Sequence, residues 1–466
     1  MRGAGPLTPL IHLIPLISLM HLFSTYSSNP RHPDAPMPTR RHFLGSALAT
    51  AILARTAEAT PATAHPVPKG RWPDAAPLQD DEAYWRELRR EFSIPADEAF
   101  FNTCTLGSSP RVVQDAVIDH MRQVDATIAH WDYRAEHPDY FTGYRPETDL
   151  RAKLGQLINA SGDEIALIQN ATLGANYVAN GLTMHPGEEV IMTNQEHVGC
   201  ESPWQLKAKR YGVYIKKVTV PTPPENPQQL IDLFVNASTP QTRVWAIPHL
   251  TSGTAVLFPV AQLCAAARQR GIISVSDGAQ GCGNMRLDMQ AIGADAYFSS
   301  PHKWLLSPKG TGWLYIRRDR LPEVWATVVS GQWDNYHDGM YRFMQIGSGN
   351  LSLLKGYEAA VDFHNRIGPD RVYARLMALA NRLRDGLKQI PQARITSPQH
   401  PDLVSPTTIW ALQGYTGPQL MDELWNRAKI RCRSMGEGVR QGCAIYNSPE
   451  EIDRTLSTIR AMVRRA

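Results

Sequence analysis

Short apolar runs alternate with longer helical segments through the middle of the chain. The runs lie at 165–168, 190–192, 243–247, 272–276 and 295–299. Between them, apolar residues recur at the three- and four-residue spacing of helices. This alternation predicts an α/β fold with a mainly parallel sheet and crossover helices. Because the carboxyl ends of parallel strands meet at one edge of a sheet, polar residues that follow the runs should gather there.

Patterns on either side of this region predict further elements. Helices are expected at Asp80–Phe92, Arg111–Val124 and Asp149–Ile158, a brief strand at 99–102 and an antiparallel strand at Trp313–Ile316. A long helical region, Leu351–Ile390, precedes a smaller α+β unit that ends in the helix Pro449–Arg464. The predicted divisions are an N-terminal extension (1–64), a linker and helix (65–98), a large domain (99–350), connecting helices (351–390) and a small domain (391–466).

The first 64 residues have the pattern of an export signal. Thr39-Arg40-Arg41-His42-Phe43-Leu44 precedes a mildly apolar run at 45–54, and small-residue cleavage sites follow at Ala57-Glu58-Ala59 or Ala62-Thr63-Ala64. This order predicts a twin-arginine signal peptide, the twin-arginine export machinery as a partner and a periplasmic location. The alternative is a chance arginine pair ahead of an alanine-rich helix. Since signals stand at the terminus, we expect translation to start at Met37.

Composition and charge exclude several classes of protein. The chain of 466 residues is 43% hydrophobic and carries a net charge of +4, with lysine and arginine spread along it. It therefore lacks the basic patch that nucleic-acid binding needs. The apolar stretch 7–23 is broken by prolines and histidines, and no later segment looks membrane-spanning. Six scattered cysteines without C-x-x-C spacing argue against a zinc site, no metal is expected, and we expect buried free thiols.

Candidate chemistry is concentrated between Ile272 and Ile316. One apolar run ends on Asp277, the next ends near Ser300, and Lys303 follows. At the carboxyl edge of a parallel sheet, this pair suits pyridoxal phosphate: lysine forms a Schiff base and aspartate pairs with the pyridine nitrogen. Taken singly, an aspartate after a strand is usually a turn former and a lone loop lysine is usually solvated.

Two further strand ends carry candidate cofactor contacts. At 169–176, a strand passes into a helix with Thr172 as the expected N-cap, and free N–H groups there could bind a phosphate. His197 follows the strand at 190–192 and could stack on a planar cofactor, although a capping or surface role is the ordinary alternative.

Together these residues resemble class V aminotransferases of the fold-type I pyridoxal-phosphate superfamily, and most of all the isopenicillin N epimerase-like branch. The resemblance covers nearly all of 95–466. The motifs that carry it are D-G-A-Q at 277–280, G-A-D-A-Y-F and S-S-P-H-K-W ending at 304, G-S-G-N at 347–350, and V-R-Q-G-C-A-I-Y-N-S-P-E-E-I-D at 439–453.

The resemblance implies a role for each matching residue. Lys303 would hold the cofactor covalently and act as general base, Asp277 would keep the pyridine nitrogen protonated, and His197 would stack on the ring. Gln280 would hydrogen-bond the phenolic oxygen. The phosphate would be held by Thr172, adjoining backbone amides including that of Ala171, Ser300 and His302.

Three more positions follow from the same resemblance. Ser348 matches a phosphate contact that the family takes from a neighbouring subunit, which implies a homodimer. Arg440 matches the arginine that binds the substrate α-carboxylate, although it could instead pair with Glu437. Ser252 stands where the family often has asparagine, so its cofactor contact should be weakened or replaced.

The implied activity is epimerase-like chemistry at the amine-bearing carbon of an amino acid or small peptide. Transamination, β-elimination, side-chain tailoring of a peptide such as a siderophore, and a non-catalytic binding protein remain alternatives. Cysteine desulfurase activity is disfavoured because only 433–439 separate Cys432 from Arg440, which leaves no loop for a nucleophilic cysteine. The glycines at 278–283 do not form a dinucleotide-binding G-x-G-x-x-G.

Substrate specificity should lie outside the Asp277–Lys303 stretch. Two aromatic loops, 130–145 and 331–342, together with Arg440, are expected to line the substrate pocket. An epimerase also needs a second acid/base opposite Lys303. The candidates for it are His130, Tyr133 and Tyr144.

Overall fold

The computed structural model describes residues 69–73, 82–130, 147–331, 333–335 and 337–464. The expected signal segment 1–64 lies outside these ranges, as does nearly all of the aromatic loop 130–145, including Tyr133 and Tyr144. The chain separates into two units, Met1–Val67 and Pro68–Ala466. The fold and the site below belong to the second unit.

A seven-stranded sheet forms the centre of this unit, in the order β2-β8-β7-β6-β5-β3-β4. Its strands are β2 (Ile165–Ile168), β3 (Glu189–Thr193), β4 (Tyr214–Val218), β5 (Thr242–Pro248), β6 (Ile273–Asp277), β7 (Ala296–Ser299) and β8 (Gly312–Ile316). All neighbours pair in parallel except β8, which is antiparallel to both β2 and β7. The predicted mainly parallel sheet is confirmed.

Edge strand β4 was not predicted from the sequence. Its residues, YIKKV, are exposed or half-buried except for the last one. The other six strands of this sheet were predicted, because both of their faces are covered and they carry continuous apolar runs. An edge strand has no such requirement, so its sequence lacks the signal.

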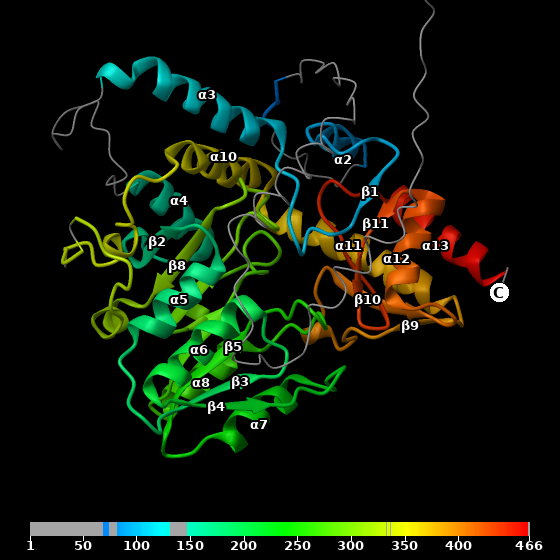
Figure 1. Cartoon of the computed structure of the whole chain (residues 1–466). Coiled ribbons are helices and arrows are strands. Elements are labelled where there is room, and N and C mark those ends of the chain that lie inside the picture. The colour runs from blue at the N-terminus through cyan, green and yellow to red at the C-terminus, as the bar shows by residue number, and fades with distance from the viewer. Residues whose placement is uncertain (1–68, 74–81, 131–146, 332, 336, 465–466) are drawn as a thin grey trace, which may run out of the picture. The chain divides into compact units, whose positions relative to one another are not determined.

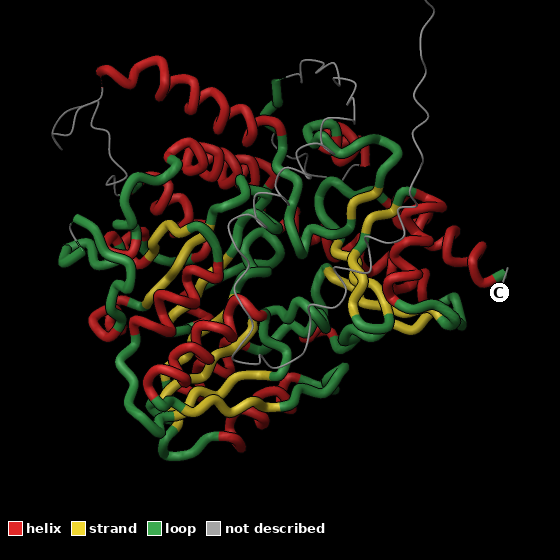
Figure 2. Tube along the Cα trace, in the orientation of Figure 1, coloured by secondary structure: helices red, strands yellow, loops and turns green. Residues whose placement is uncertain are grey.

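Helices cover both faces of the sheet (Figures 1 and 2). α5 (Ala171–Gly181) and α6 (Val198–Tyr211) pack with one face in a cluster that includes Tyr177, Trp204 and Phe343. The opposite cluster takes side chains from α4 (Thr148–Ile158), α7 (Pro227–Ala237), α8 (Val260–Gln269) and α10 (Leu351–Ile367). This arrangement leaves the carboxyl edge of the sheet for the segments that follow the strands.

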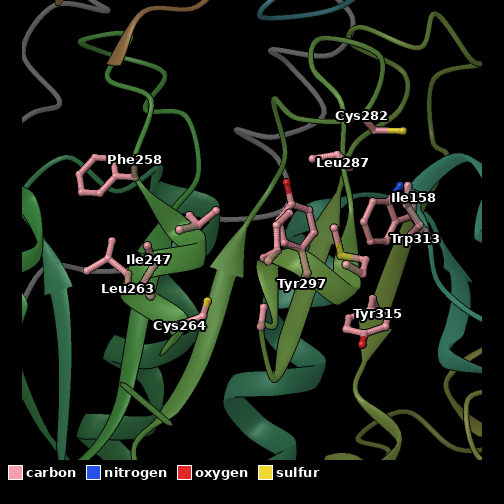
Figure 3. Close-up of a cluster of buried hydrophobic side chains, with 14 of the residues drawn as sticks. Ile158, Ile247, Phe258, Leu263, Cys264, Cys282, Leu287, Tyr297, Trp313 and Tyr315 are labelled. Atoms are coloured by element: carbon pink, nitrogen blue, oxygen red, sulfur yellow. The ribbon is translucent and has the colours of Figure 1, made fainter. Parts of the chain in front are cut away.

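Tyr297 anchors the second cluster beneath that edge (Figure 3). Its ring stacks on Trp313, with centroids 5.3 Å apart and an interplanar angle of 11°. Its hydroxyl lies 2.8 Å from Nδ1 of His249. Above the ring lies Gly278, where an added Cβ would meet the Tyr297 ring at 1.9 Å. Glycine after Asp277 is thus required because an aromatic ring occupies the space of a side chain.

A second sheet lies in the C-terminal part, visible in Figure 2 as a separate group of strands. Its order is β12-β13-β10-β9, all antiparallel, formed by β9 (Ala393–Ile395), β10 (Thr407–Leu412), β12 (Arg433–Met435) and β13 (Gly438–Gly442). Helices α11 (Pro369–Lys388), α12 (Gly417–Ala428) and α13 (Pro449–Val463) supply the core on it. The predicted α+β unit with its final helix is present.

The segment before the large sheet joins this C-terminal part. β1 (Ala99–Phe100) pairs in parallel with β11 (Ile430–Arg431), and Asn102 forms a bridge with Gly442. The sequence pattern placed this strand in the large domain. Its partner is instead more than 300 residues away, and no local pattern indicates such a pairing.

The remaining helices follow the predicted pattern with shifted ends. α2 spans Glu82–Arg89 and α3 spans Arg111–Thr127, α9 is one turn at Met289–Ile292, and the long helical region divides into α10 and α11 at Gly368, whose φ is +97°. Short 3-10 turns lie at Ile128–His130, Gly162–Glu164, Arg318–Glu323, Tyr341–Phe343 and Pro401–Leu403.

None of the helices in the described ranges combines the length and apolar character of a membrane span. All six cysteines are free and buried, as expected.

Replacing Gly278 should destabilise the fold. In Gly278→Ala the new methyl group would overlap the Tyr297 ring, and overpacking of this kind costs roughly 1–3 kcal/mol or more. Urea denaturation followed by tryptophan fluorescence measures the loss in the free energy of unfolding. Gly349→Ala is the matched control because nothing lies within 4 Å of its added Cβ. Equal stability of the two variants would contradict the account of Gly278.

Candidate active site

Five strands of the large sheet deliver polar segments to its carboxyl edge. The segments are Asn170–Thr172 after β2, Gln195–His197 after β3, His249–Thr254 after β5, Asp277–Gln280 at the end of β6, and Ser300–Lys303 after β7. Each apolar strand is buried up to its last residues, so the first polar side chains emerge together. The sheet topology brings these segments together at one edge, as predicted.

Asp277 is the last residue of β6 and is held on both sides by backbone hydrogen bonds. Its Oδ1 accepts from the Ala279 N–H at 2.8 Å, and its carbonyl accepts from the His249 N–H at 2.8 Å. The adjacent Gly278 packs directly against the Tyr297 ring. Packing as well as hydrogen bonds therefore sets the direction of the Asp277 side chain. A carboxylate fixed in this way can face a cationic ring nitrogen.

Lys303 follows β7 in a tight turn, in which its N–H donates to the Ser300 carbonyl at 3.0 Å. Burial lowers the pKa of its ammonium, and the carboxylate of Asp277 partly opposes that shift. Within the described ranges, the Nζ atom has no hydrogen bond and no ion pair. A desolvated lysine facing one carboxylate has the character of a reactive amine rather than of a structural cation.

The Lys303 turn is packed tightly by two glycines. An added Cβ at Gly107 would lie 2.0 Å from the Lys303 carbonyl oxygen, and one at Gly283 would lie 2.4 Å from the Leu305 N. The Gly107 N–H also donates to the His302 carbonyl at 3.0 Å. Segments from distant parts of the chain therefore hold the lysine's backbone in place.

The helix after β2 begins differently from the prediction. Its N-cap is Asn170, whose Oδ1 accepts from the Leu173 N–H at 3.0 Å, and Thr172 lies inside the first turn. The Ala171 N–H donates to Ser300 Oγ at 2.9 Å, which joins two of the predicted phosphate contacts. The N–H and hydroxyl of Thr172 have no hydrogen-bond donor or acceptor opposite them in the described structure and are free to bind an anion.

The Thr172 hydroxyl lies against the start of the next helix. An added Cβ at Gly199 would be 2.4 Å from Thr172 Oγ1 and 3.2 Å from His197 Nδ1. The first turns of α5 and α6 therefore meet, and only a glycine allows it. This contact places the predicted phosphate and ring contacts side by side.

Two histidines of the site are neutral in character. His302 Nδ1 lies 3.0 Å from the Thr311 carbonyl, and burial lowers its pKa to about 4. His197 caps α6 by accepting the Gly199 N–H at 3.1 Å, and its pKa is lowered by desolvation and then by Lys303. The ring of His197 remains exposed at the edge of the sheet, as a stacking surface requires.

Gln280 links the loop of Lys303 to the N-terminal turn. Its Nε2 donates to the Cys104 carbonyl at 2.9 Å, and its Oε1 accepts from Trp304 Nε1 at 2.7 Å. Since a primary amide carries two N–H bonds, one is left for the predicted contact with a phenolic oxygen.

Arg440 is buried on β13 and is surrounded by neutral acceptors. Its guanidinium donates to the carbonyl and hydroxyl of Ser252 at 2.8 and 2.6 Å, and to Thr105 Oγ1 at 2.9 Å. The predicted alternative partner, Glu437, pairs instead with Arg394 at 3.1 Å. Ser252, whose cofactor contact was expected to be weakened or replaced, here accepts hydrogen bonds from the arginine.

Two predicted residues lie apart from this group. Ser348 is exposed in the loop before α10 and makes no hydrogen bond to the other site residues in the described structure. His130 is exposed in the short turn after α3. Of the aromatic loop 331–342, Met340 and Tyr341 are core residues, whereas Trp333 is exposed.

Several residues at the site were not predicted from the sequence. Asn102 and Thr105 reach Arg440 from the N-terminal turn. Glu196 accepts hydrogen bonds from the N–H and hydroxyl of Thr193, and burial raises its pKa to about 8. Burial also raises the pKa of Cys200, with a further contribution from Asp277. For Glu196, its position directly before His197 was the available signal; the others become visible only through tertiary contacts.

A family comparison agrees with this geometry. The model of the family described as aminotransferase class V matches residues 113–461. The chain belongs to the aminotransferase class V family.

Relatives within this family carry out different reactions. Isopenicillin N epimerase of Streptomyces clavuligerus is 28% identical over 401 residues, which cover 82% of this chain and 98% of the epimerase. A probable cysteine desulfurase of Xylella fastidiosa strain 9a5c is 27% identical over 407 residues, covering 80% and 94% of the two chains. Desulfurases are thus among the relatives, and the comparisons do not support excluding that activity.

A solved structure of a C-DES variant with glycine covalently linked to its pyridoxal phosphate superposes with a TM-score of 0.70. It is 23% identical in sequence and covers 80% of this chain and 98% of that one. C-DES is a cystine C–S lyase. This similarity confirms the fold-type I architecture, and the family's cofactor is pyridoxal 5′-phosphate.

The residues at this site fit pyridoxal 5′-phosphate. A desolvated amine without a hydrogen bond (Lys303), a fixed carboxylate (Asp277) and free first-turn donors (Thr172) match a carbonyl, a pyridine nitrogen and a phosphate. Each of these groups is oriented by contacts that the cofactor does not supply.

Lys303→Ala should abolish covalent attachment of the cofactor. We expect wild-type protein loaded with pyridoxal phosphate and treated with borohydride to gain the reduced cofactor on the peptide that contains Lys303. Mass spectrometry of the intact protein and of its peptides measures this label. Lys309→Ala is the matched control, since Lys309 Nζ donates to Ser109 Oγ at 3.1 Å and its pKa is also lowered by burial. Retention of the label in Lys303→Ala would refute the assignment.

Proposed function

We propose that this pyridoxal-phosphate enzyme moves a proton at the amine-bearing carbon of an amino acid or small peptide, in an epimerase-like reaction. The observation that carries the proposal is the desolvated Lys303, whose pKa is lowered and whose ammonium has no hydrogen bond in the described ranges. A lysine in this condition is better suited to accept a proton than a solvated one, because burial favours its neutral form.

Pyridoxal phosphate, when bound, supplies the electron sink that stabilises negative charge on the carbon beside the substrate amine. Asp277 would hold the cofactor's ring nitrogen and His197 would lie on its face. Thr172, the Ala171–Ser300 pair and His302 would hold the phosphate. The proton from the substrate carbon would go to Nζ of Lys303.

Arg440 would orient the substrate through its carboxylate. It is 1% exposed and its four acceptors, on Ser252, Asn102 and Thr105, are all neutral. Burial without a countercharge is costly for a guanidinium. A substrate carboxylate would supply the missing charge and would fix the substrate relative to Lys303.

Sulfur transfer is the second candidate, because desulfurases are relatives. The two cysteines that flank Arg440 in the sequence argue against it. Burial raises the pKa of both Cys432 and Cys443 to about 12, and only Gly436 and Glu437 separate the strands of the β12–β13 hairpin. A nucleophilic cysteine must be an accessible thiolate. We therefore place proton transfer at the amine-bearing carbon first.

Deuterium exchange distinguishes the reactions. Protein loaded with pyridoxal phosphate is incubated in deuterated water with a panel of L-amino acids, and NMR and chiral chromatography follow the substrate. Epimerase-like chemistry predicts deuterium at the amine-bearing carbon together with the D-enantiomer, and Lys303→Ala should lower the exchange rate by several orders of magnitude. A keto acid, pyruvate, or alanine with persulfide sulfur as the main product would overturn the proposal in favour of transamination, β-elimination or desulfuration, respectively.

Export and dimer formation stay predictions that rest on the sequence. We propose that the segment 1–64 directs the folded enzyme to the periplasm, where it would act on its substrate or tailor a peptide. We also propose a homodimer, in which the exposed Ser348 would reach a neighbouring site. Fractionation of the producing cells, with Arg40 and Arg41 both changed to lysine as a control, and light scattering of the native protein test these two proposals.

A further inference from the structure

A second arginine lies beside Arg440 at the mouth of the site. Arg433 on β12 is directly opposite Arg440 on β13 in the antiparallel hairpin. Residues paired in this way project to the same face of a sheet. Both guanidinium groups donate to one oxygen, Thr105 Oγ1, at 3.2 Å from Arg433 and 2.9 Å from Arg440. The two donor nitrogens are thus no farther apart than the sum of these distances.

This pair of cations has no countercharge in the described part of the chain. No carboxylate lies within 4.0 Å of either guanidinium, although the same sheet carries the ion pair Arg394–Glu437 at 3.1 Å. Like charges opposite one another on a hairpin are unfavourable, and burial of Arg440 increases that cost. The arrangement is one that an anion with more than one acidic group would stabilise.

The two arginines differ in burial and therefore in what they can hold. Arg440 is almost fully buried and its donors are already directed by Ser252 and Thr105. Arg433 is exposed, has a single hydrogen bond, and keeps the rest of its donor fork free. The charges of both arginines contribute to lowering the pKa of His197. Both guanidinium groups therefore influence the electrostatic potential at the residue proposed to stack on the cofactor ring.

We propose that Arg433 binds a second carboxylate, so that the preferred substrate is an amino acid or small peptide with an acidic side chain. This inference rests on the proposed function for the place of the first carboxylate, which Arg440 holds. Arg433 is then a specificity-determining residue: it sets which substrates bind and takes no part in proton transfer.

Binding of dicarboxylates without an amine tests the inference independently of turnover. Isothermal titration calorimetry is carried out on the cofactor-loaded enzyme with a series from succinate to pimelate and with monocarboxylates of matched length. At least one dicarboxylate should bind about tenfold more tightly than its monocarboxylate partner, as one additional charge-assisted contact at a partly exposed site provides. Arg433→Gln should remove that preference and leave monocarboxylate binding within about twofold.

Arg394→Gln is the matched control, because it removes an exposed arginine from the same sheet that is already paired with Glu437. It should change neither affinity. Cofactor absorbance and circular dichroism confirm that each variant is folded and loaded. Equal weakening of both ligand classes in Arg433→Gln, no change in either class, or no dicarboxylate preference in the wild type would each overturn the inference. Failure of deuterium exchange would refute the proposed function. It would not change the result of the dicarboxylate-binding measurement, so the two failures can be told apart.

Discussion

A buried amine opposite a fixed carboxylate is the interaction on which the site depends. Lys303 loses hydration and gains no hydrogen bond in return within the described ranges, while Asp277 partly restores the charged form. Such an amine is held only because its backbone is confined, by the close approach of Gly107 and Gly283 to the Lys303 turn. The reactivity expected of Lys303 follows from a conformation that the surrounding packing imposes.

The second requirement of the proposed function is a cation that can bind a substrate carboxylate, and Arg440 on the C-terminal sheet is the proposed one. Arg440 reaches the turn after β5 through Ser252 and the N-terminal turn through Thr105. The bridge between Asn102 and Gly442 ties that turn to β13. The proposed cofactor contacts thus come from the large sheet, and the proposed substrate contacts come from segments near both ends of the described chain.

This division explains how one family accommodates different reactions. Asp277, Lys303 and the first turns of α5 and α6 are the proposed cofactor contacts, and these would be the same for any substrate. In the proposed function, the β12–β13 hairpin supplies the groups that face the substrate. Here it is short, its neighbouring cysteines are buried, and it presents two arginines on one face. Those features separate this chain's substrate preference from its shared cofactor chemistry.

The sequence by itself determined the elements whose signals are local. Apolar runs marked five strands of the sheet, β2, β3, β5, β6 and β7, because strands covered on both faces must be apolar. Asp277 and Lys303 were found because each directly follows such a run, and D-G-A-Q and S-S-P-H-K-W added the family resemblance. The cofactor therefore follows from short stretches of sequence.

Tertiary structure alone decided the contacts between distant stretches. Edge strand β4 had no apolar signal, and Asn170 rather than Thr172 caps α5 because the choice depends on backbone direction at the strand end. The Ser252–Arg440 contact joins residues 188 positions apart, and the Thr105–Arg433 contact spans 328. Such pairs leave no periodicity in the sequence, since their proximity comes from how two sheets and the N-terminal turn pack together. For that reason the candidate cofactor site and Arg440 could be predicted from the sequence, whereas the pairing of Arg440 with Arg433 appeared only in the folded chain.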